Sequence, residues 1–272
     1  MSYKMLVCDY DMTLGIRPNI ISKENLEAVK DFQKNGGIFV LCTGRMYESI
    51  KNILDEYNLK CDIVSYQGAL INDKDGYVIY DGGIDYQTAY DFVKLAEDNN
   101  ENINIFVDDT HYTNVFDKKT MFYEYSSRTK AHLLDCKPSD YILENKCKLR
   151  KVIFMAEADV TEQKIEKYQK DFPTLEINSG GYYLTEIINK NENKGKAIEF
   201  LAKKYNLDLS EIIAIGDSTN DISMIKTAGL GIAVGDGSEQ LKKVADEVTL
   251  NFEDNAVAHV INKYCKNTQN II

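Results

Sequence analysis

Two acidic residues stand directly after a short apolar run near the beginning of the sequence. The run is Met5–Cys8, and Asp9 and Asp11 follow it. Side chains alternate along an extended strand, so both carboxylates can share one side if the chain stays extended. Carboxylates at the end of a buried strand are costly to place there without a metal ion, a partner or a catalytic task. The pair is therefore a candidate reactive site, and the alternative is a loop Asp beside a helix-capping Asp.

Three further polar residues have a similar place in the sequence. Thr43 and Asp217 each come after an apolar run, and Asp221 follows four positions after Asp217. If these runs are strands of one open parallel sheet, their carboxyl ends meet at the edge where such sheets bind ligands. We therefore expect Asp9, Thr43 and Asp217 at the same edge.

The predicted edge carries an excess of negative charge. Its four Asp residues contribute −4, and Lys194 would reduce the sum to −3. Such a cluster would repel an anion by about 4 kcal/mol for each pair of unit charges about 4 Å apart at an effective dielectric constant of 20. Carboxylates without nearby His or Cys favour Mg²⁺ over Zn²⁺ as the cation that offsets this repulsion. Because protein-bound Mg²⁺ usually also holds substrate phosphate, the pattern indicates phosphoryl chemistry.

The segments that carry these residues alternate between strand and helix patterns, which is typical of a parallel α/β sheet. Early in the chain we expect strands at 5–8, 38–42 and 62–65 and helices near 23–35 and 46–57. The same style returns after residue 190, with helices at 194–205, 219–227, 238–245 and 254–265 and strands at 212–215 and 230–234.

The middle of the chain has a different pattern. Residues 69–80 predict a hairpin that turns at Asp75-Gly76. Beyond it we expect helices at 86–98 and 161–171 and strands at 103–107, 151–155 and near 175–187. This order predicts an α+β domain at 83–186, inserted into a discontinuous α/β domain made of residues 1–82 and 187–272.

Composition narrows the classes of partner. The 272 residues include 43 acidic and 32 basic side chains, which gives a net charge of −11. An acidic chain lacks the basic footprint of a nucleic-acid or anionic-membrane binder, and the sequence has no run of about 18 apolar residues that could span a membrane. Six cysteines without a CxxC pair favour reduced thiols. We expect a cytoplasmic monomer or weak homodimer without nucleic-acid or membrane partners.

Four motifs in a fixed order resemble those of the haloacid dehalogenase-like phosphatases, in their Cof-type branch of subfamily IIB. They are DYDMTLG at 9–15, CTGR at 42–45, NKGKAIEFL at 193–201 and GDSTND at 216–221. The resemblance implies a Rossmann-like parallel-sheet core with an inserted α+β type IIB cap at 83–186 that selects the substrate.

The resemblance also implies a role for each matching position. Asp9 would be the nucleophile that forms an aspartyl phosphate, and Asp11 would be the general acid and base. Lys194 would neutralise the nucleophile and the transferring phosphoryl group. The phosphate would be bound by Tyr10 through its amide, Thr43, Gly44, Lys194 and Asn220. Mg²⁺ would be bound by Asp9, the backbone carbonyl of Asp11 and Asp217, with Asp221 binding the metal or supporting its waters or Lys194.

Other side chains leave alternatives open. The Thr13 hydroxyl is expected to bond the backbone of its own loop, and Arg45 either contacts the substrate or the inserted domain or pairs with an acid. Met12, Gln67 and Asp236 depart from the residues common in the family, which bears on substrate range more than on catalysis.

Several remaining polar side chains are assigned by position. Cys8 and Cys42 are expected in the core, and the histidines at 111, 132 and 259 are expected to be structural. Candidate substrate contacts in the inserted domain are Asp108, Asp109, His111, Tyr112 and Tyr182.

The implied activity is Mg²⁺-dependent hydrolysis of small phosphorylated metabolites. Sugar phosphates are the first expectation, and a nucleotide or a phosphorylated cofactor such as pyridoxal phosphate is the second. One alternative is a phosphomutase or phosphotransferase with the same chemistry, and another is a non-catalytic phosphometabolite-binding protein. Loss of Asp9 or Asp217 would mark the binding protein, and both residues are present.

Overall fold

The computed structural model describes residues 3–17, 19–155, 161–179 and 184–265. The chain divides into two compact units. The core unit comprises Met1–Tyr80 and Asn193–Ile272, and the inserted unit comprises Asp81–Glu192. The boundaries expected from the sequence, at 82 and 187, lie near these two points.

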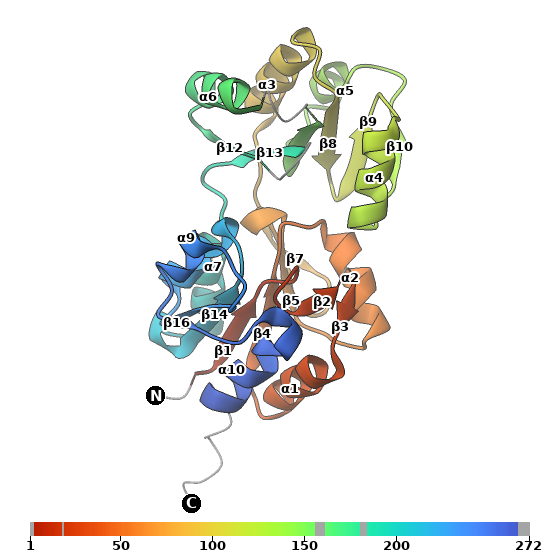
Figure 1. Cartoon of the computed structure of the whole chain (residues 1–272). Helices are drawn as coiled ribbons and strands as arrows, with labels where there is room; N and C mark the ends of the chain where they lie inside the picture. Colours follow the sequence, from red (N-terminus) through yellow and green to blue (C-terminus); the bar gives the residue numbers. More distant parts are fainter. Residues whose placement is uncertain (1–2, 18, 156–160, 180–183, 266–272) are drawn as a thin grey trace, which may run out of the picture. The chain divides into compact units, whose positions relative to one another are not determined.

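The core unit is built on an eight-stranded sheet (Figure 1). The parallel strands are β1 (Met5–Cys8), β4 (Ile38–Cys42), β5 (Asp62–Ser65), β14 (Ile212–Gly216), β15 (Leu230–Ala233) and β16 (Glu247–Val248). The strand order is β16-β15-β14-β1-β4-β5-β6-β7, which places β1 at the centre between β14 and β4. The hairpin β6 (Leu70–Asn72) and β7 (Val78–Asp81) extends the sheet at one edge.

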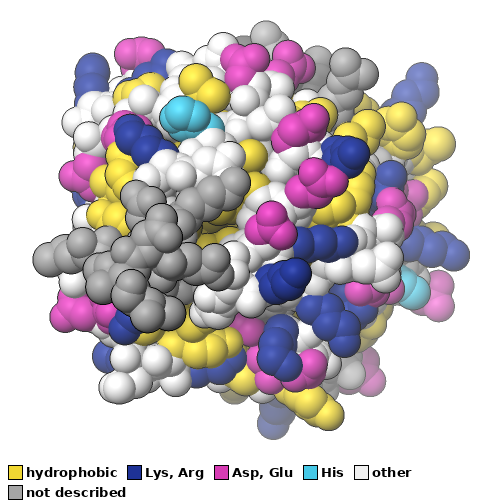
Figure 2. Space-filling model, turned by 90° about the horizontal axis from the view of Figure 1, so that it is seen from below, with side chains coloured by type: hydrophobic (Ala, Val, Ile, Leu, Met, Phe, Trp, Pro, Cys, Tyr) yellow, Lys and Arg dark blue, Asp and Glu magenta, His cyan; other side chains and the backbone are white. Residues whose placement is uncertain are grey.

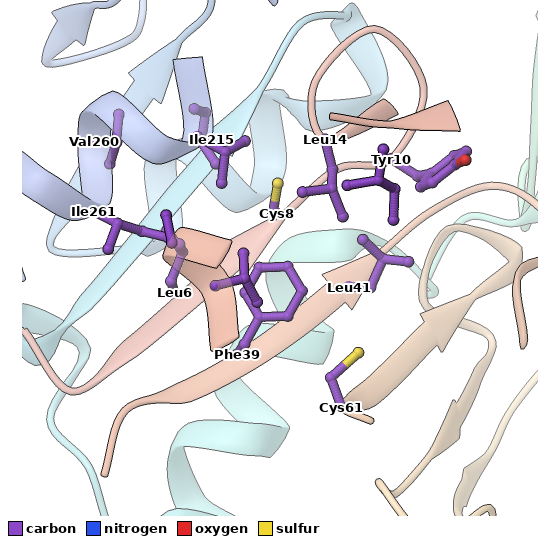
Figure 3. Packing of buried hydrophobic residues seen from close by; sticks show 14 of the residues in the cluster. Leu6, Cys8, Tyr10, Leu14, Phe39, Leu41, Cys61, Ile215, Val260 and Ile261 are labelled. Carbon is purple, nitrogen blue, oxygen red and sulfur yellow. The ribbon is translucent and has the colours of Figure 1, made fainter. Parts of the chain in front are cut away.

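Helices cover both faces of this sheet. One face packs against α1 (Lys23–Lys34), α2 (Tyr47–Glu56) and α10 (Ala256–Tyr264), and the other against α7 (Lys194–Tyr205), α8 (Ile222–Thr227) and α9 (Glu239–Lys242). The side chains of β1 alternate between these two helical layers. Leu6 and Cys8 pack against α1, α2 and α10, the first layer, and Met5 and Val7 pack against the second. Figure 3 shows the first layer, where Leu6 and Phe39 lie near Val260 and Ile261. A strand buried on both faces needs a continuous apolar run, and β1 has one.

The inserted unit has its own six-stranded sheet, ordered β10-β9-β8-β11-β13-β12. Its strands are β8 (Ile103–Val107), β9 (Thr110–Thr113), β10 (Ala131–Leu133), β11 (Lys151–Met155), β12 (Leu175–Ser179) and β13 (Leu184–Asn189). Its helices are α3 (Tyr86–Asp98), α4 (Lys118–Ser127), α5 (Pro138–Asn145) and α6 (Thr161–Asp171). Apolar side chains of α3, α5 and α6 pack on one face of the sheet and form a separate core. Neighbouring strands are antiparallel except for β9 and β10.

The fold class expected from the sequence is confirmed, and the long elements match their expected ranges closely. Several shorter elements differ from the expectation. The helix expected at 219–227 starts as a 3₁₀ turn at Thr219–Asp221, and the helix expected at 238–245 is only α9. The small hairpin of β2 (Gly15–Arg17) and β3 (Ile20–Ile21) was not predicted, because two or three residues show no measurable periodicity.

The surface carries charges of both signs. Figure 2 shows Lys, Arg, Asp and Glu side chains interspersed over one face. In the part of the chain that the structure describes, no helix is long and apolar enough to cross a membrane. All six cysteines are free thiols, and Cys8 and Cys42 are buried in the core as expected.

Candidate active site

The sheet brings the three predicted strand ends together. Strands β14, β1 and β4 are neighbours, and Asp217, Asp9 and Thr43 follow them directly. The Asp9 amide donates to the Ile215 carbonyl at 3.0 Å, which continues the β1–β14 pairing by one residue. Carboxylate oxygens of Asp9, Asp217 and Asp221 all lie within 4.8 Å of one another. The expected ligand-binding edge is therefore present with its acidic cluster.

Lys194 is the cation inside this cluster. Its Nζ lies 2.5 Å from Asp9 Oδ1 and 2.6 Å from Asp221 Oδ1, and the side chain is fully buried. Asn193 caps helix α7 by accepting from the Lys196 amide at 3.0 Å, so Lys194 starts the helix in a fixed place. Burial alone would lower the pKa of Lys194, but the carboxylates of Asp221 and Asp9 outweigh it and raise the pKa well above its usual value. Lys194 is therefore an ammonium group.

One ammonium does not balance three carboxylates. Burial, together with the neighbouring charges of Asp221 and Asp217, raises the pKa of Asp9 well above its usual range despite Lys194. Burial and the charge of Asp221 also raise the pKa of Asp217 to about 7. The cluster therefore favours an added positive charge, either a proton or a metal ion.

Asp221 supports the other groups of the cluster. Its Oδ1 accepts from Lys194, and its Oδ2 accepts from the amides of Asp217 and Ser218, both at 3.0 Å. The side chain is completely buried at the end of the 3₁₀ turn Thr219–Asp221. These bonds fix both Lys194 and the backbone that carries Asp217.

Thr13 does not behave as the sequence suggested. Its hydroxyl donates to Asp217 Oδ1 at 3.3 Å, and it is not bonded to the backbone of its own loop. The difference arises because Met12 adopts a left-handed conformation, with φ of 55°, and turns the loop so that Thr13 becomes buried. Thr13 thus links the first motif to the fourth.

The chain does not stay extended through Asp11, so the condition for a shared side with Asp9 is not met. The chain turns after β1, where the Tyr10 carbonyl accepts from the amides of Thr13 and Gly15. The Asp11 side chain is 51% exposed, against 7% for Asp9, and lies outside the acidic cluster. Of the alternatives for Arg45, pairing with an acid is the one observed, because its guanidinium holds Asp11.

The candidate phosphate-binding residues lie near this cluster. Thr43 and Gly44 follow β4, the strand beside β1, and Asn220 directly precedes Asp221. The buried Thr43 accepts from the Arg45 amide at 3.2 Å through its hydroxyl. Gly44 lies against the Gln67 side chain, where any Cβ would collide with the amide. The side chain of Asn220 donates to Gln67 Oε1 at 3.3 Å. Gln67 therefore connects the second and fourth motifs.

Sequence reasoning treated Gln67 only as a departure from the family pattern. It is buried and has a left-handed backbone with φ of 59°. Tyr66 before it is also left-handed, with φ of 51°. Gly68, shortly after a predicted strand, was the sequence signal for a tight turn here. The hydrogen bond between Gln67 and Asn220 had no such signal, because the two residues lie far apart in sequence.

The candidate contacts of the inserted unit have mixed outcomes. Asp108 and Asp109 form the turn between β8 and β9, with φ of 45° and 60°. His111 is buried and stacks on Phe106 at 4.7 Å between ring centroids, and burial lowers its pKa to about 4. This packing is typical of a structural histidine, which was also the expectation for His111. Tyr112 packs against Tyr141, and Tyr182 lies outside the described residues.

The donor set fits the predicted magnesium ion. Only oxygen ligands converge in the cluster of Asp9, Asp217 and Asp221. The neighbouring Cys8 thiol donates to the Asp9 carbonyl, and burial raises its pKa well above the usual value, so it stays protonated. Hard oxygen donors without thiolate or imidazole suit Mg²⁺.

Comparisons with known proteins agree with this fold. The sequence profile of the haloacid dehalogenase-like hydrolases matches residues 6–261. The chain is 28% identical over 280 residues to phosphatase YwpJ of Bacillus subtilis, covering 95% of this chain and 98% of that one. It is 28% identical to the 5-amino-6-(5-phospho-D-ribitylamino)uracil phosphatase YwtE of the same organism, covering 96% and 97%. A crystal structure from Thermotoga maritima superposes with a TM-score of 0.86 at 25% identity, covering 96% and 97%.

The parallel sheet with helices on both faces defines an α/β protein, and the family match makes it a hydrolase. The protein belongs to the haloacid dehalogenase-like hydrolase family. A less similar structure, a subclass IIB sugar phosphatase at 20% identity and a TM-score of 0.81, shares the fold.

Proposed function

We propose that the protein is a Mg²⁺-dependent phosphatase that hydrolyses small phosphorylated metabolites, sugar phosphates first among them, through an aspartyl-phosphate intermediate. The observation that carries the proposal is the contact of Lys194 Nζ with Asp9 Oδ1 in a buried cluster of excess negative charge. A carboxylate in this setting is costly unless it has a task, and the cluster favours a cation.

The proposed reaction has two steps. A carboxylate oxygen of Asp9 attacks phosphorus, the bond from phosphorus to the leaving oxygen breaks, and Asp11 supplies a proton to that oxygen. Asp11 then takes a proton from water, which attacks the aspartyl phosphate and releases inorganic phosphate with Asp9 regenerated. Asp9, the Asp11 carbonyl and Asp217 would hold Mg²⁺, which would supply positive charge for the phosphoryl oxygens.

The other residues bind the phosphoryl oxygens. In the proposal, the Tyr10 amide, Thr43, Gly44 and Asn220 donate to these oxygens, and Lys194 stabilises the charge that develops in transfer. Asp221 acts by holding Lys194 and the loop of Asp217 in place.

The names of the relatives favour a phosphatase over a phosphomutase or a binding protein. Besides the two phosphatases above, the HMP-PP phosphatase of Yersinia enterocolitica is 26% identical and covers 95% of this chain. These names describe chemically different substrates, and they share the character of small phosphorylated metabolites.

The test is phosphate release from a panel of phosphorylated metabolites with Mg²⁺. The panel includes sugar phosphates, nucleotides, pyridoxal phosphate and 4-nitrophenyl phosphate. We expect stoichiometric inorganic phosphate from at least one class, lost in Asp9→Asn and retained in Asp31→Asn, an exposed residue of α1. Phosphoryl return to the sugar without free phosphate would indicate a mutase, and tight binding without turnover would indicate a binding protein.

The role of the inserted unit in substrate selection is a separate part of the proposal. It is supported by the independent core of that unit and its place between Tyr80 and Asn193. A core unit with Asp81–Glu192 replaced by a short linker is expected to fold, bind Mg²⁺ and lose the parent's ranking of substrates. If the ranking were unchanged, specificity would belong to the core unit.

A further inference from the structure

Arg45 forms a bidentate ion pair with Asp11 at the edge of the site. Its Nε donates to Asp11 Oδ2 at 2.8 Å, and its Nη2 donates to Asp11 Oδ1 at 2.6 Å. Both carboxylate oxygens are therefore held by one planar guanidinium, which fixes their orientation as well as their position. Lysine could not form this pair, because its ammonium is a single point charge.

Arg45 is itself held by the loop after β1, by the β2–β3 hairpin and by Thr43 of its own segment. Its Nη1 donates to Asn19 Oδ1 at 2.9 Å, in the turn of the β2–β3 hairpin, where Asn19 has φ of 66°. Its guanidinium carbon lies 5.1 Å from the ring centroid of the buried Tyr10. Its amide donates to the Thr43 hydroxyl at 3.2 Å. Only 12% of the Arg45 side chain is exposed, so it is a fixed support.

Asp11 needs such a support more than Asp9 does. The buried Asp9 is held by Lys194, whereas the Asp11 side chain is half exposed and lies outside the acidic cluster. An exposed carboxylate would otherwise turn freely about its side-chain torsions, and each proton transfer requires it within hydrogen-bond reach of the reacting oxygen. Among the described residues, only Arg45 donates hydrogen bonds to the Asp11 carboxylate.

We propose that Arg45 is a positioning residue for the proton carrier, holding the Asp11 carboxylate in one orientation beside the phosphate site. Arg45 acts through Asp11 and does not contact the leaving group. This inference rests on the proposed phosphatase function.

The test is a double-mutant cycle read with two leaving groups. The variants are Arg45→Lys, Arg45→Gln, Asp11→Asn and the double variant Asp11→Asn/Arg45→Lys. Arg128→Lys, in the inserted unit, is the matched control. The substrates are 4-nitrophenyl phosphate, whose leaving group needs no proton, and phenyl phosphate, whose leaving group benefits from one. Quenched flow measures the first step, and circular dichroism checks folding.

The expected result follows from the indirect role. Arg45→Lys slows the first step with phenyl phosphate by about 10- to 100-fold, since a misplaced catalytic group costs up to about 10². The same step with 4-nitrophenyl phosphate changes much less, and KM for both substrates stays nearly constant. In the Asp11→Asn background, Arg45→Lys has almost no further effect, because the group that it positions is already gone.

Two results would overturn the inference. Equal losses from Arg45→Lys with and without Asp11, accompanied by a raised KM, would place Arg45 in direct contact with substrate. Equal losses with both leaving groups in a folded protein would make the Arg45 pair only structural. Arg45→Gln keeps the size but not the charge, so it tests the pair if the lysine variant is compensated. If wild-type protein released no phosphate, or Asp9→Asn kept full turnover, the proposed function would fail instead.

Discussion

Each of the two units buries a lysine against carboxylate, and the difference between the two sites separates function from structure. In the inserted unit, Lys151 Nζ lies 2.8 Å from Glu186 and 5.0 Å from the centroid of the Phe106 ring. That pair is balanced, one cation with one anion. In the core unit, Lys194 faces Asp9 and Asp221, with Asp217 close by, so negative charge exceeds positive.

Charge balance decides what each cluster requires. Burial lowers the pKa of Lys151, but the charge of Glu186 outweighs it, so the pair is complete without any ligand. The core cluster is complete only with an added proton or cation, as the raised pKa values of Asp9 and Asp217 indicate. A buried ion pair is therefore weak evidence for a functional site, whereas a buried charge imbalance is stronger evidence.

The largest expected effect comes from removing the proposed nucleophile. Asp9→Asn keeps the size of the side chain but removes the attacking oxygen's charge. We expect turnover of every substrate to fall by at least about 10⁴-fold, as for nucleophiles that act within a catalytic unit. Intact mass should show a phosphorylated wild-type protein in quenched reactions and none in the variant. Residual turnover within tenfold of wild type would exclude the aspartyl-phosphate route.

The two buried lysines give the sharpest comparison. Lys194→Met removes the cation that faces three carboxylates, so we expect kcat to fall by about 10²–10³, the usual cost of losing a group that stabilises transition-state charge. Lys151→Met with Glu186→Leu removes a balanced pair, and such replacements are often neutral or stabilising. Steady-state kinetics and thermal unfolding measure both.

A contrary pattern would break the comparison between the units. If the Lys151/Glu186 double variant lost turnover as severely as Lys194→Met while staying folded, the balanced pair would have a catalytic role after all.

The residues of the site differ in how well their positions could be predicted from the sequence. Asp9 and Lys194 were placed correctly because each depends on local signals, an apolar strand before Asp9 and an Asn-capped helix after Asn193. The orientation of Asp11 could not be predicted, because it depends on Arg45, 34 positions away, and on a turn that no periodicity marks. The same holds for the Gln67 link, which forms only once β5 and β14 lie in one sheet.

Metal binding should depend on pH through Asp217. Its pKa of about 7 in the metal-free protein exceeds the usual value, so its contribution to stability is present at low pH and is lost as pH rises through about 7. Without Mg²⁺, the melting temperature should therefore fall as the pH rises toward about 7. With Mg²⁺ at about 100 times Kd, binding should add about 2.7 kcal/mol and reverse the fall.

Asp217→Asn is the control for this prediction, since it removes the titrating group and a metal ligand together. Thermal scans with EDTA and with Mg²⁺, from pH 4.5 to 8, measure the effect. A variant that kept both the pH dependence and the Mg²⁺ stabilisation would remove Asp217 from the metal site.

The smallest expected effect comes from two buried threonines, one in each unit. The Thr13 hydroxyl donates to Asp217 Oδ1, whereas the buried Thr185 hydroxyl has no hydrogen-bond partner among the described residues. Thr13→Val keeps the shape and removes one hydrogen bond to a carboxylate. This should weaken Mg²⁺ binding by two- to tenfold, in line with about 0.5–1.5 kcal/mol for an ordinary hydrogen bond, because 3.3 Å is long for an O–H···O contact. Thr185→Val should leave Mg²⁺ binding unchanged and slightly raise the melting temperature, because it removes a hydroxyl that is buried at a cost. Calorimetric titration of Mg²⁺ and thermal unfolding would show both. Equal effects of the two substitutions on Mg²⁺ affinity would mean that the hydroxyl of Thr13 does not orient Asp217.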